Sequence, residues 1–479
     1  MYKEYNKENL GDEKFFYFFN EISKIPRRPG CEAKIADYLV KFAIKRKLEY
    51  YRDKYNNVII WKKASKGYEY KEILGLQNHT DMVCEKTADS THNFDKDGLE
   101  LYIDGDFVRA KNTTLGADNG VGVAYVLAIL DDKNLLTPEL ECIFTVEEET
   151  TMNGSRFIDV SKIKSKRIIS FDSFYEDIMV INSASCKEWS SDIAILKEGI
   201  ADNYKKYNLE FKKFPGGHSG LDIDDKKRGN PIKLAFSLLS DFEDIYINKL
   251  NGGSRVSIIP RNISLDFAIN ENENFKIKNM LNKIEKMKAY YGDNVVIKLQ
   301  ETENNYNEKY INKRISRKII DFVEEFENGT LRYDEEGQVI LSANLGVIEQ
   351  DEDKVIFRYS VRSNEKELGI NKMKDCNNLI AKYGIKNFEF DEMKAFEPIE
   401  NSQLVEKCSE IYFDTFKTNV KKIKSQTCLE IGFLAEKIKE LEYIAVAPNI
   451  YNAHSPNEKF SISSSKKFWS YIVNILKNL

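Results

Sequence analysis

Apolar residues recur at helical spacing toward both ends of the chain. Residues 13–25 and 33–46 each carry such a stripe, and the turn-forming run IPRRPG separates the two predicted helices. The run NNVIIW that follows predicts a short buried strand. Farther along, two more helices are predicted at 404–416 and 463–476, with a strand at 441–448 between them.

Three predicted strands in the first half of the chain end at polar residues. The run EILGLQ leads into NHTDM, the strand ELECIFTVEEETT alternates apolar residues until it meets three glutamates, and RIISFDSF ends at an acid. Between the first two strands, residues 116–132 open with turn residues and continue as an apolar helix. Open α/β sheets place their sites beyond the strand ends, so we expect a site here.

The middle of the chain has a different pattern of predicted strands and helices. From about residue 178 to 396, shorter strands alternate with amphipathic helices, which is typical of an α+β domain. A chain of 479 residues is long enough for two or three domains. We therefore predict one α/β domain built from residues 1–185 and 398–479, interrupted by a smaller inserted α+β domain at 186–397.

Composition and net charge argue against several classes of protein. The formal net charge is −5, which disfavours a nucleic-acid binder. Seven cysteines without a CxxC pair argue against a disulfide scaffold and against a thiolate zinc site. The first residues are charged, and no run is apolar enough to span a membrane, so we expect a cytoplasmic protein without a membrane partner.

Imidazoles and carboxylates gather at the predicted strand ends and at one distant loop. Two imidazoles with several carboxylates suit a divalent cation such as zinc, manganese or cobalt. The surplus of carboxylates indicates either a two-metal site or one ion with a free base. Taken singly, each residue also fits a structural role, such as an N-cap for Asp118 or a solvated face for the glutamates. The set comprises His79, Asp81, Asp118, Glu147, Glu148, Glu149, Asp172 and His454.

Six motifs resemble those of the aminoacyl-histidine (Xaa-His) dipeptidases, within the larger superfamily of co-catalytic zinc carboxypeptidases and aminoacylases. The resemblance runs from about residue 21 to the C-terminus, and NHTDMVCEK and IYNAHSPNEK are specific to the dipeptidase branch. The other motifs are TTLGADNGVGVAYVLAIL, FTVEEETTMNGS, SFDS, and PGGHSGLDI with RGNPIKL. The resemblance implies an α/β metallopeptidase catalytic domain, with a central mixed sheet flanked by helices, and an inserted lid and dimerisation domain.

The resemblance also implies roles for the strand-end residues. Asp118 would bridge two divalent metal ions, zinc first, with manganese or cobalt as alternatives. His79 and Asp172 would complete the shell of one ion, and Glu149 with His454 that of the other. Glu148 would be the general base on the metal-bridging water, and Asp81 would orient His79. The family further implies a cis peptide bond between Asp118 and Asn119.

Three more residues receive roles from the resemblance. His218 in PGGHSG would contribute to oxyanion binding, often in the partner subunit of a homodimer. Arg362 would pair with a substrate carboxylate, for which a guanidinium is the natural bidentate partner. Glu430 would receive the free amine of the substrate. A small peptide is therefore the expected substrate.

The chain departs from the family pattern at three positions, which bear on substrate preference more than on activity. Ser257 stands where the family has Asn, Gln426 where it has His, and Thr151 where it has Gly. We expect metal-dependent hydrolysis of dipeptides, with an Xaa-His preference or a broad range. The alternatives are a related aminoacylase or amidase, and a non-catalytic binding protein that keeps the fold.

Overall fold

The computed structural model describes residues 2–303 and 308–479, which form two compact units. The first unit comprises Met1–Asn182, Phe396–Ile423 and Leu429–Leu479, and the second comprises Ser183–Ala395 and Lys424–Cys428. The chain thus returns briefly to the second unit at 424–428, a crossing that the sequence pattern does not predict. The lid and dimerisation roles of the second unit stay predictions.

The first unit is built on a mixed sheet whose strands run in the order β2, β3, β7, β4, β8, β24, β9, β23. Strand β4 is parallel to both β7 and β8, and β24 is parallel to β8, whereas β3 is antiparallel to β7. The strands span Glu49–Arg52 (β2), Val58–Lys62 (β3), Leu140–Thr145 (β7), Leu74–His79 (β4), Arg167–Ser170 (β8), Glu442–Ala445 (β24), Ile178–Val180 (β9) and Lys421–Ile423 (β23).

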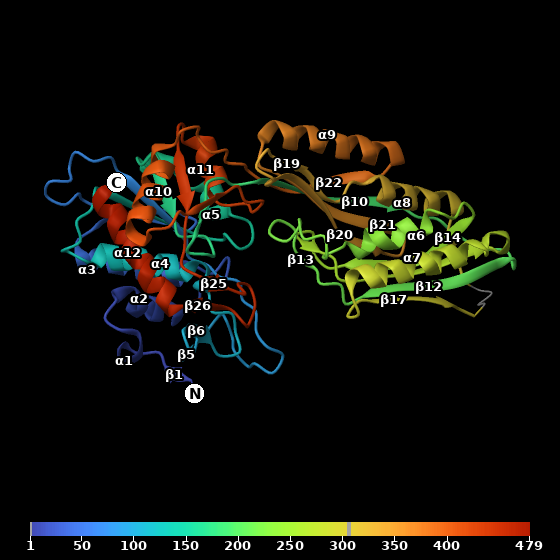
Figure 1. Cartoon of the computed structure of the whole chain (residues 1–479), viewed down its shortest axis with the longest axis horizontal. Helices are drawn as coiled ribbons and strands as arrows, with labels where there is room; N and C mark the ends of the chain where they lie inside the picture. The colour runs from blue at the N-terminus through green and yellow to red at the C-terminus, as the bar shows by residue number, and fades with distance from the viewer. Residues whose placement is uncertain (1, 304–307) are drawn as a thin grey trace. The chain divides into compact units, whose positions relative to one another are not determined.

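Helices cover both faces of this sheet. Successive side chains of β7 pack into two different apolar clusters on opposite faces of the sheet. Cys142 and Phe144 belong to one cluster, and Ile143 belongs to the other. Strand β7 is therefore buried on both faces, as expected of a sheet between helical layers. The helices of this unit are α1 (Lys7–Leu10), α2 (Lys14–Ser23), α3 (Ala33–Arg46), α4 (Ala117–Asp131), α5 (Asn153–Phe157), α10 (Gln403–Phe416), α11 (Ile431–Lys437) and α12 (Ile462–Asn478) (Figure 1).

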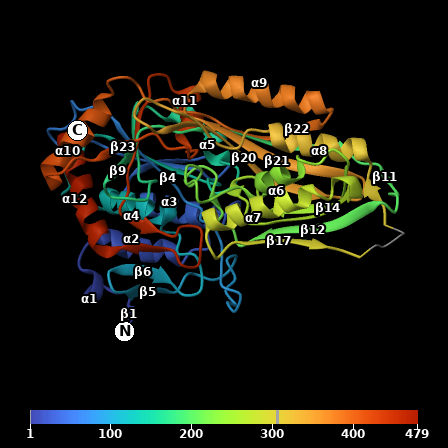
Figure 2. The ribbon, with the colours of Figure 1, turned by 45° about the vertical axis from the view of Figure 1, so that its right-hand side comes forward.

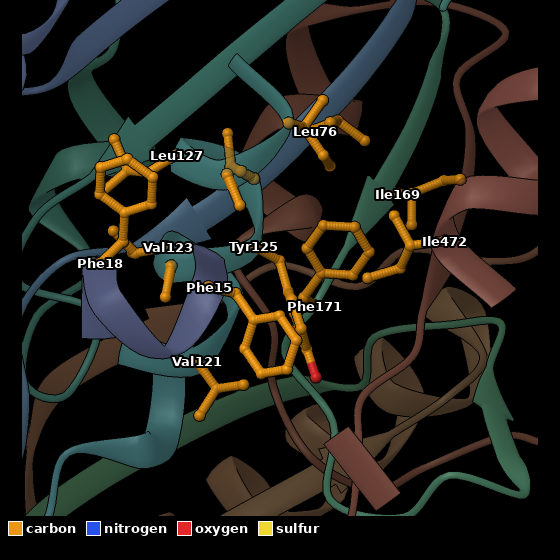
Figure 3. Close-up of a cluster of buried hydrophobic side chains, with 14 of the residues drawn as sticks. Phe15, Phe18, Leu76, Val121, Val123, Tyr125, Leu127, Ile169, Phe171 and Ile472 are labelled. Atoms are coloured by element: carbon orange, nitrogen blue, oxygen red, sulfur yellow. The ribbon is translucent and has the colours of Figure 1, made fainter. Parts of the chain in front are cut away.

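Helix α4 lies at the centre of the larger cluster. It is buried over almost its whole length, which explains its uniformly small and apolar sequence. Phe15 of α2, Ile472 of α12 and Leu76 of β4 point toward it from different sides, around Tyr125 and Leu127 (Figure 3). The start of α4 is thereby held rigidly beside the end of β4, where the candidate site lies.

A smaller antiparallel sheet extends the same unit. Its strands are ordered β1, β5, β6, β26, β25, and each is only two to four residues long. They span Lys3–Glu4 (β1), Leu101–Asp104 (β5), Phe107–Ala110 (β6), Lys459–Ser461 (β26) and Ile450–Tyr451 (β25). The loop that carries His454 connects β25 to β26, so this sheet holds both ends of that loop.

The second unit has a long antiparallel sheet with helices packed along it (Figure 2). Alternating burial along its strands, as at Tyr207, Leu209 and Phe211, indicates one covered face. The strands are β17 (Val296–Glu301), β12 (Tyr204–Lys212), β16 (Ile263–Asn270), β14 (Ile245–Gly253), β20 (Val339–Gln350), β21 (Lys354–Ser363), β10 (Ser185–Ala194) and β22 (Lys386–Met393), with β19 (Gly329–Tyr333) beside β20.

Short elements and several helices complete the described part of the second unit. The helices are α6 (Pro231–Leu239), α7 (Lys276–Tyr291), α8 (Lys313–Glu325) and α9 (Lys366–Tyr383). Two short strand pairs join β11 (Lys197–Glu198) to β18 (Tyr310–Ile311), and β13 (Gly217–His218) to β15 (Ile258–Ile259). Among the described residues, no helix is both long and apolar enough to cross a membrane. The α/β class predicted from the sequence is confirmed.

Candidate metal centre

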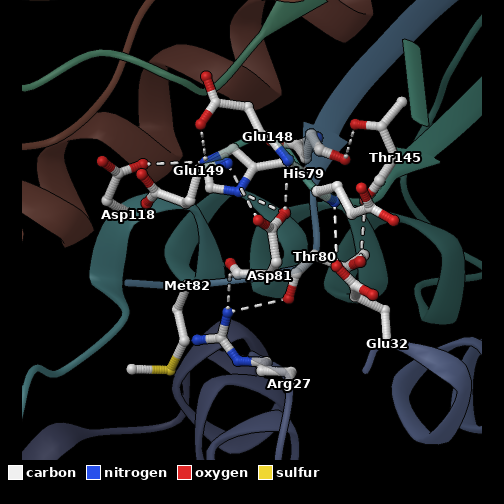
Figure 4. A network of polar contacts seen from close by, with 12 residues as sticks. Arg27, Glu32, His79, Thr80, Asp81, Met82, Asp118, Thr145, Glu148 and Glu149 are labelled. Atoms are coloured by element: carbon white, nitrogen blue, oxygen red, sulfur yellow. Dashed lines mark hydrogen bonds and ion pairs between the residues drawn. The ribbon is translucent and has the colours of Figure 1, made fainter. Parts of the chain in front are cut away.

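Four of the candidate residues meet at one edge of the first unit's sheet because their strands are parallel neighbours. His79 is the last residue of β4, Asp172 follows β8 by two residues, and Glu148 and Glu149 follow β7 in a loop. Asp118 comes from the start of α4, and His454 comes from the loop between β25 and β26. The structure therefore brings together every residue that the sequence singles out as a candidate ligand or base. Figure 4 shows part of this set, with His79, Asp118, Glu148 and Glu149 around Asp81.

Asp118 lies between the two imidazoles. Its Oδ1 is 3.1 Å from His79 Nε2, and its Oδ2 is 3.2 Å from His454 Nε2. Glu149 Oε2 is 3.0 Å from His454 Nε2, and Asp172 Oδ1 is 3.9 Å from His79 Nε2. Three groups have ligand atoms within 4.8 Å of one another: His79, Asp118 and Asp172; Asp118, Glu149 and His454; and His79, Glu148 and Glu149.

Burial and mutual repulsion strongly perturb the pKa values of this cluster. Burial raises the pKa of Glu148 well above its usual value, and burial together with the neighbouring Asp118 raises the pKa of Asp172 to about 8. Burial alone would lower the pKa of His454, but its hydrogen bonds to Asp118 and Glu149 raise it to about 11. Burial would raise the pKa of Asp118, but the two histidines lower it overall.

The donor set fits divalent cations. Four carboxylates and two imidazoles converge, with His79 and Asp118 buried and His454 exposed, and Glu149 Oε1 has no hydrogen-bond partner among the described residues. Carboxylate and imidazole ligands without thiolates are those that zinc, manganese and cobalt accept. Cations at this position would offset the repulsion that raises the pKa values of the glutamates and Asp172.

Asp81 ties the histidine to the glutamate loop. Its carboxylate accepts hydrogen bonds from the backbone N–H groups of Glu148 and Glu149, at 3.1 and 3.0 Å. Its Oδ1 also lies 3.4 Å from His79 Nδ1, on the ring edge opposite Asp118. Strand β7 ends at Thr145, and Glu147 adopts a left-handed backbone with φ 56°. A turn held by Asp81 therefore sets the directions of the two glutamates.

Two further residues hold the loops of the site, and sequence reasoning assigned no role to either. The Glu458 carboxylate accepts hydrogen bonds from four consecutive backbone N–H groups, at residues 115–118, with distances of 2.8 to 3.3 Å. Arg27 is buried and donates to the carbonyl oxygens of Thr80, Asp81 and Gly116, at 3.1, 3.0 and 2.8 Å (Figure 4). The Asp118–Asn119 peptide bond is cis, as the resemblance implies.

Glu430 lies near the same cluster and interacts electrostatically with Glu148 and Asp172. Its side chain is 1% exposed, and its Oε2 accepts hydrogen bonds from Gln77 and from Thr145, each at 2.5 Å. Burial raises its pKa to about 7. Burial thus favours the protonated form of Glu430, and its predicted contact with a substrate amine stays a prediction. Thr151, one of the departures, donates a hydrogen bond from its hydroxyl to Glu147 at 2.7 Å.

The remaining candidates lie in the second unit, close to one another. His218 Nδ1 accepts hydrogen bonds from the backbone N–H groups of Gly220 and Leu221, both at 3.1 Å. Arg362 is buried on β21 and donates from Nε to Ser219 Oγ at 3.3 Å, which joins it to the His218 loop. The departures Ser257 and Gln426 also lie here: the Ser257 carbonyl accepts from Ser219 N, and Gln426 Oε1 accepts from Ser342.

Comparison with known proteins places these residues in a family. The model of peptidase family M20/M25/M40 matches residues 75–478. The chain is 27% identical to the cytosol non-specific dipeptidase of Escherichia coli K12, over 98% of each chain. Its structure is similar to the aminoacylhistidine dipeptidase from Vibrio alginolyticus, with a TM-score of 0.85 and 28% identity over 98% of each chain.

A more distant structure shares the fold. A tripeptidase from Staphylococcus aureus has a TM-score of 0.57 and 14% identity, with 98% of each chain covered. The resemblance stated from the motifs is thus confirmed, and the match extends over nearly the whole chain. The chain belongs to peptidase family M20/M25/M40.

Proposed function

We propose that the chain is a dipeptidase that uses two divalent metal ions, and that Asp118 bridges them. The observation that carries this proposal is the position of Asp118, whose two carboxylate oxygens each lie beside a different histidine. With Asp118, His79 and Asp172 would hold one ion, and Glu149 and His454 would hold the other. Zinc is the first choice for this donor set, with manganese or cobalt as alternatives.

Glu148 is the proposed general base. When bound, the ions supply Lewis acidity, which makes a water molecule easier to deprotonate and stabilises negative charge on the scissile carbonyl oxygen. The Glu148 carboxylate takes the proton of the attacking water and then delivers it to the leaving amine. Burial and the neighbouring acids raise the pKa of Glu148, which favours proton uptake. Asp81 keeps the glutamate loop and His79 in place through the contacts described above.

The second unit supplies the proposed substrate contacts. His218 accepts two backbone hydrogen bonds at Nδ1, so a neutral ring carries its proton on Nε2, where it can donate to an oxyanion. Arg362 is a buried cation suited to a substrate carboxylate. Glu430 is proposed to receive the free amine of the substrate.

The substrate class follows from these groups and from the named relatives. A carboxylate partner and an amine partner define a short peptide with both ends free. One relative is named as a non-specific dipeptidase and another as an aminoacylhistidine dipeptidase, which supports either a broad range or an Xaa-His preference. We also propose a cytoplasmic homodimer in which His218 serves the partner's site. Analytical ultracentrifugation that finds a fully active monomer would overturn the dimer and this role of His218.

Amino-acid release from a panel of substrates tests the proposed activity. The purified chain is loaded with zinc, manganese or cobalt and offered Xaa-His dipeptides, other dipeptides and N-acetyl amino acids. The proposal predicts metal-dependent cleavage of dipeptides. Exclusive cleavage of the N-acetyl compounds would instead identify an aminoacylase, and the absence of turnover with every metal would support a binding protein.

A further inference from the structure

Arg362 is a buried cation with an unusual set of partners. Among the described residues, its hydrogen bonds go to the Ser219 hydroxyl, the Gln426 carbonyl and the Cys428 sulfur, at 3.3, 3.2 and 3.1 Å. None of these three acceptors is a carboxylate. The Glu188 carboxylate interacts with Arg362 through its charge, and among the three hydrogen-bond acceptors Arg362 favours negative charge on the one that can ionise, the thiol of Cys428.

A second cysteine lies beside the first. Cys186 sits directly opposite Arg362 in the pairing of β10 with β21. The backbone N–H of Ala184 donates to the carbonyl oxygen of Thr427 at 2.9 Å, which brings the segment before Cys428 alongside the start of β10. The two thiols are close enough to share a hydrogen bond, and neither cysteine is in a disulfide. Cys186 is 2% exposed, whereas Cys428 is partly exposed.

We propose that Cys428 and Cys186 form an oxidisable thiol pair: Cys428, next to Arg362, reacts with peroxide, and Cys186 then closes a disulfide with it. Both cysteines belong to the second unit, so the reaction needs no group of the metal centre. The two thiols take no part in the proposed peptidase chemistry, and this modification site shares only Arg362 with the proposed substrate contacts.

The chemistry balances with hydrogen peroxide as the oxidant. The Cys428 thiolate attacks one peroxide oxygen, the O–O bond breaks, and hydroxide leaves with a proton from solvent as water, which gives a sulfenic acid on Cys428. The Cys186 sulfur then attacks the Cys428 sulfur, an S–S bond forms, and the sulfenic oxygen leaves as a second water. Two thiols are oxidised by two electrons, and one peroxide is reduced to two waters.

The two thiols differ in the way that this sequence of steps requires. The hydrogen bond from Cys186, together with the charge of Arg362, lowers the pKa of Cys428, whereas the same hydrogen bond and burial raise the pKa of Cys186. Cys428 is also the more exposed of the two. Cys428 is therefore the thiol that meets the oxidant, and Cys186 is the thiol that resolves the product.

Peptide mapping without reductant tests the pair in the full-length protein. After brief treatment with hydrogen peroxide, we expect mass spectrometry to find a linked peptide that contains Cys186 and Cys428, and dithiothreitol to remove it. In Cys186→Ser the expected product is a Cys428 sulfenic acid that dimedone traps. The control Cys31→Ser, which removes an exposed cysteine of the other unit, is expected to leave the linkage unchanged.

A second measurement isolates the part played by Arg362. The rate of iodoacetamide labelling at Cys428 is compared between wild type and Arg362→Gln, with the buried Cys376 as internal reference. Loss of the charge is expected to slow labelling by about tenfold for each pKa unit regained.

Two results would overturn the proposal. One is peroxide treatment of the wild type that oxidises other cysteines and yields no 186–428 linkage. The other is Cys428 that is labelled no faster than Cys376 in the wild type. Both readings come from the folded wild-type protein, so they stand even if a variant fails to fold, and neither depends on peptidase activity.

Discussion

Replacement of Glu458 by Gln is expected to weaken metal binding more than it weakens the fold. The Glu458 carboxylate holds the loop before Asp118 through four backbone N–H groups, two on each oxygen. A Gln side chain keeps one oxygen but turns its NH₂ group toward the other two donors. The Asp118 carboxylate then loses its fixed position, although the loop keeps its sequence.

The magnitude follows from the contacts that are lost. Two hydrogen bonds to a charged acceptor are worth about 3 to 6 kcal/mol. Burial raises the pKa of Glu458 to about 7 despite these hydrogen bonds, so a neutral Gln avoids part of the cost of burying a charge and offsets part of this loss. The free energy of unfolding should fall by about 0 to 3 kcal/mol. Loss of a group that positions a ligand typically costs about 10-fold to 100-fold in metal affinity.

A matched variant separates the two effects. Glu141 is a buried carboxylate of the same unit, and it accepts hydrogen bonds from Trp61, Lys164 and Ser165, none of which adjoins a candidate ligand. Metal competition with a chromophoric chelator and urea unfolding are measured for Glu458→Gln and Glu141→Gln. We expect weaker metal binding only in Glu458→Gln. Equal metal affinity in the two variants would refute the positioning role.

Three further predictions concern other parts of the first unit. Arg27→Lys should lower metal affinity about 10-fold or more, because an ammonium group cannot reach the carbonyls of both loops as the guanidinium does; an unchanged chelator titration would contradict this. Burial and the nearby Asp81 raise the pKa of Glu32 to about 7, above its unfolded value of 4.5. The folded chain therefore binds this proton more tightly than the unfolded chain does. The free energy of unfolding should fall by about 3 kcal/mol as the pH rises from about 4.5 to 7. Urea unfolding across this range should show a smaller fall in Glu32→Gln, and parallel curves would argue against the shift. Leu127→Ala, at a fully buried position of α4, should lower the free energy of unfolding by about 2 to 5 kcal/mol. The control Leu136→Ala, at an exposed position, should lower it by less than about 0.5 kcal/mol. Similar losses in the two variants, measured by urea unfolding, would contradict the packing described for α4.

Elements with a strong local period could be predicted from the sequence alone. The stripe at 33–46 coincides with α3, because helical amphipathicity is a property of neighbouring residues. The short strands of the five-stranded sheet escaped prediction because two to four residues carry too little pattern. The half-exposed strand β2, with the sequence EYYR, escaped for a similar reason.

The candidate site also contains residues that the sequence predicts and residues that it does not. His79, Asp172 and the glutamates could be grouped because parallel strands end at one edge of a sheet. The roles of Glu458 and Arg27 depend on contacts with residues far away in the chain, at Leu115 and Thr80 among others, which no local pattern contains. The turn at Glu147 depends on Asp81, which lies in the loop after β4, so the sequence around the glutamates does not contain the signal for it.

Paired measurement of metal content and turnover in Glu148→Gln tests the central claim most directly. Glu148 is proposed to move a proton and not to hold a metal ion, although its carboxylate lies in a group that could bind one. We predict two metal ions per chain in both wild type and variant, dipeptide hydrolysis by the wild type, and a loss of about 100-fold to 10,000-fold in the variant. A variant that loses its metal together with its activity would contradict the assignment of Glu148 as the base, and a fully metallated wild type that releases no amino acid from any dipeptide would contradict the proposed function itself.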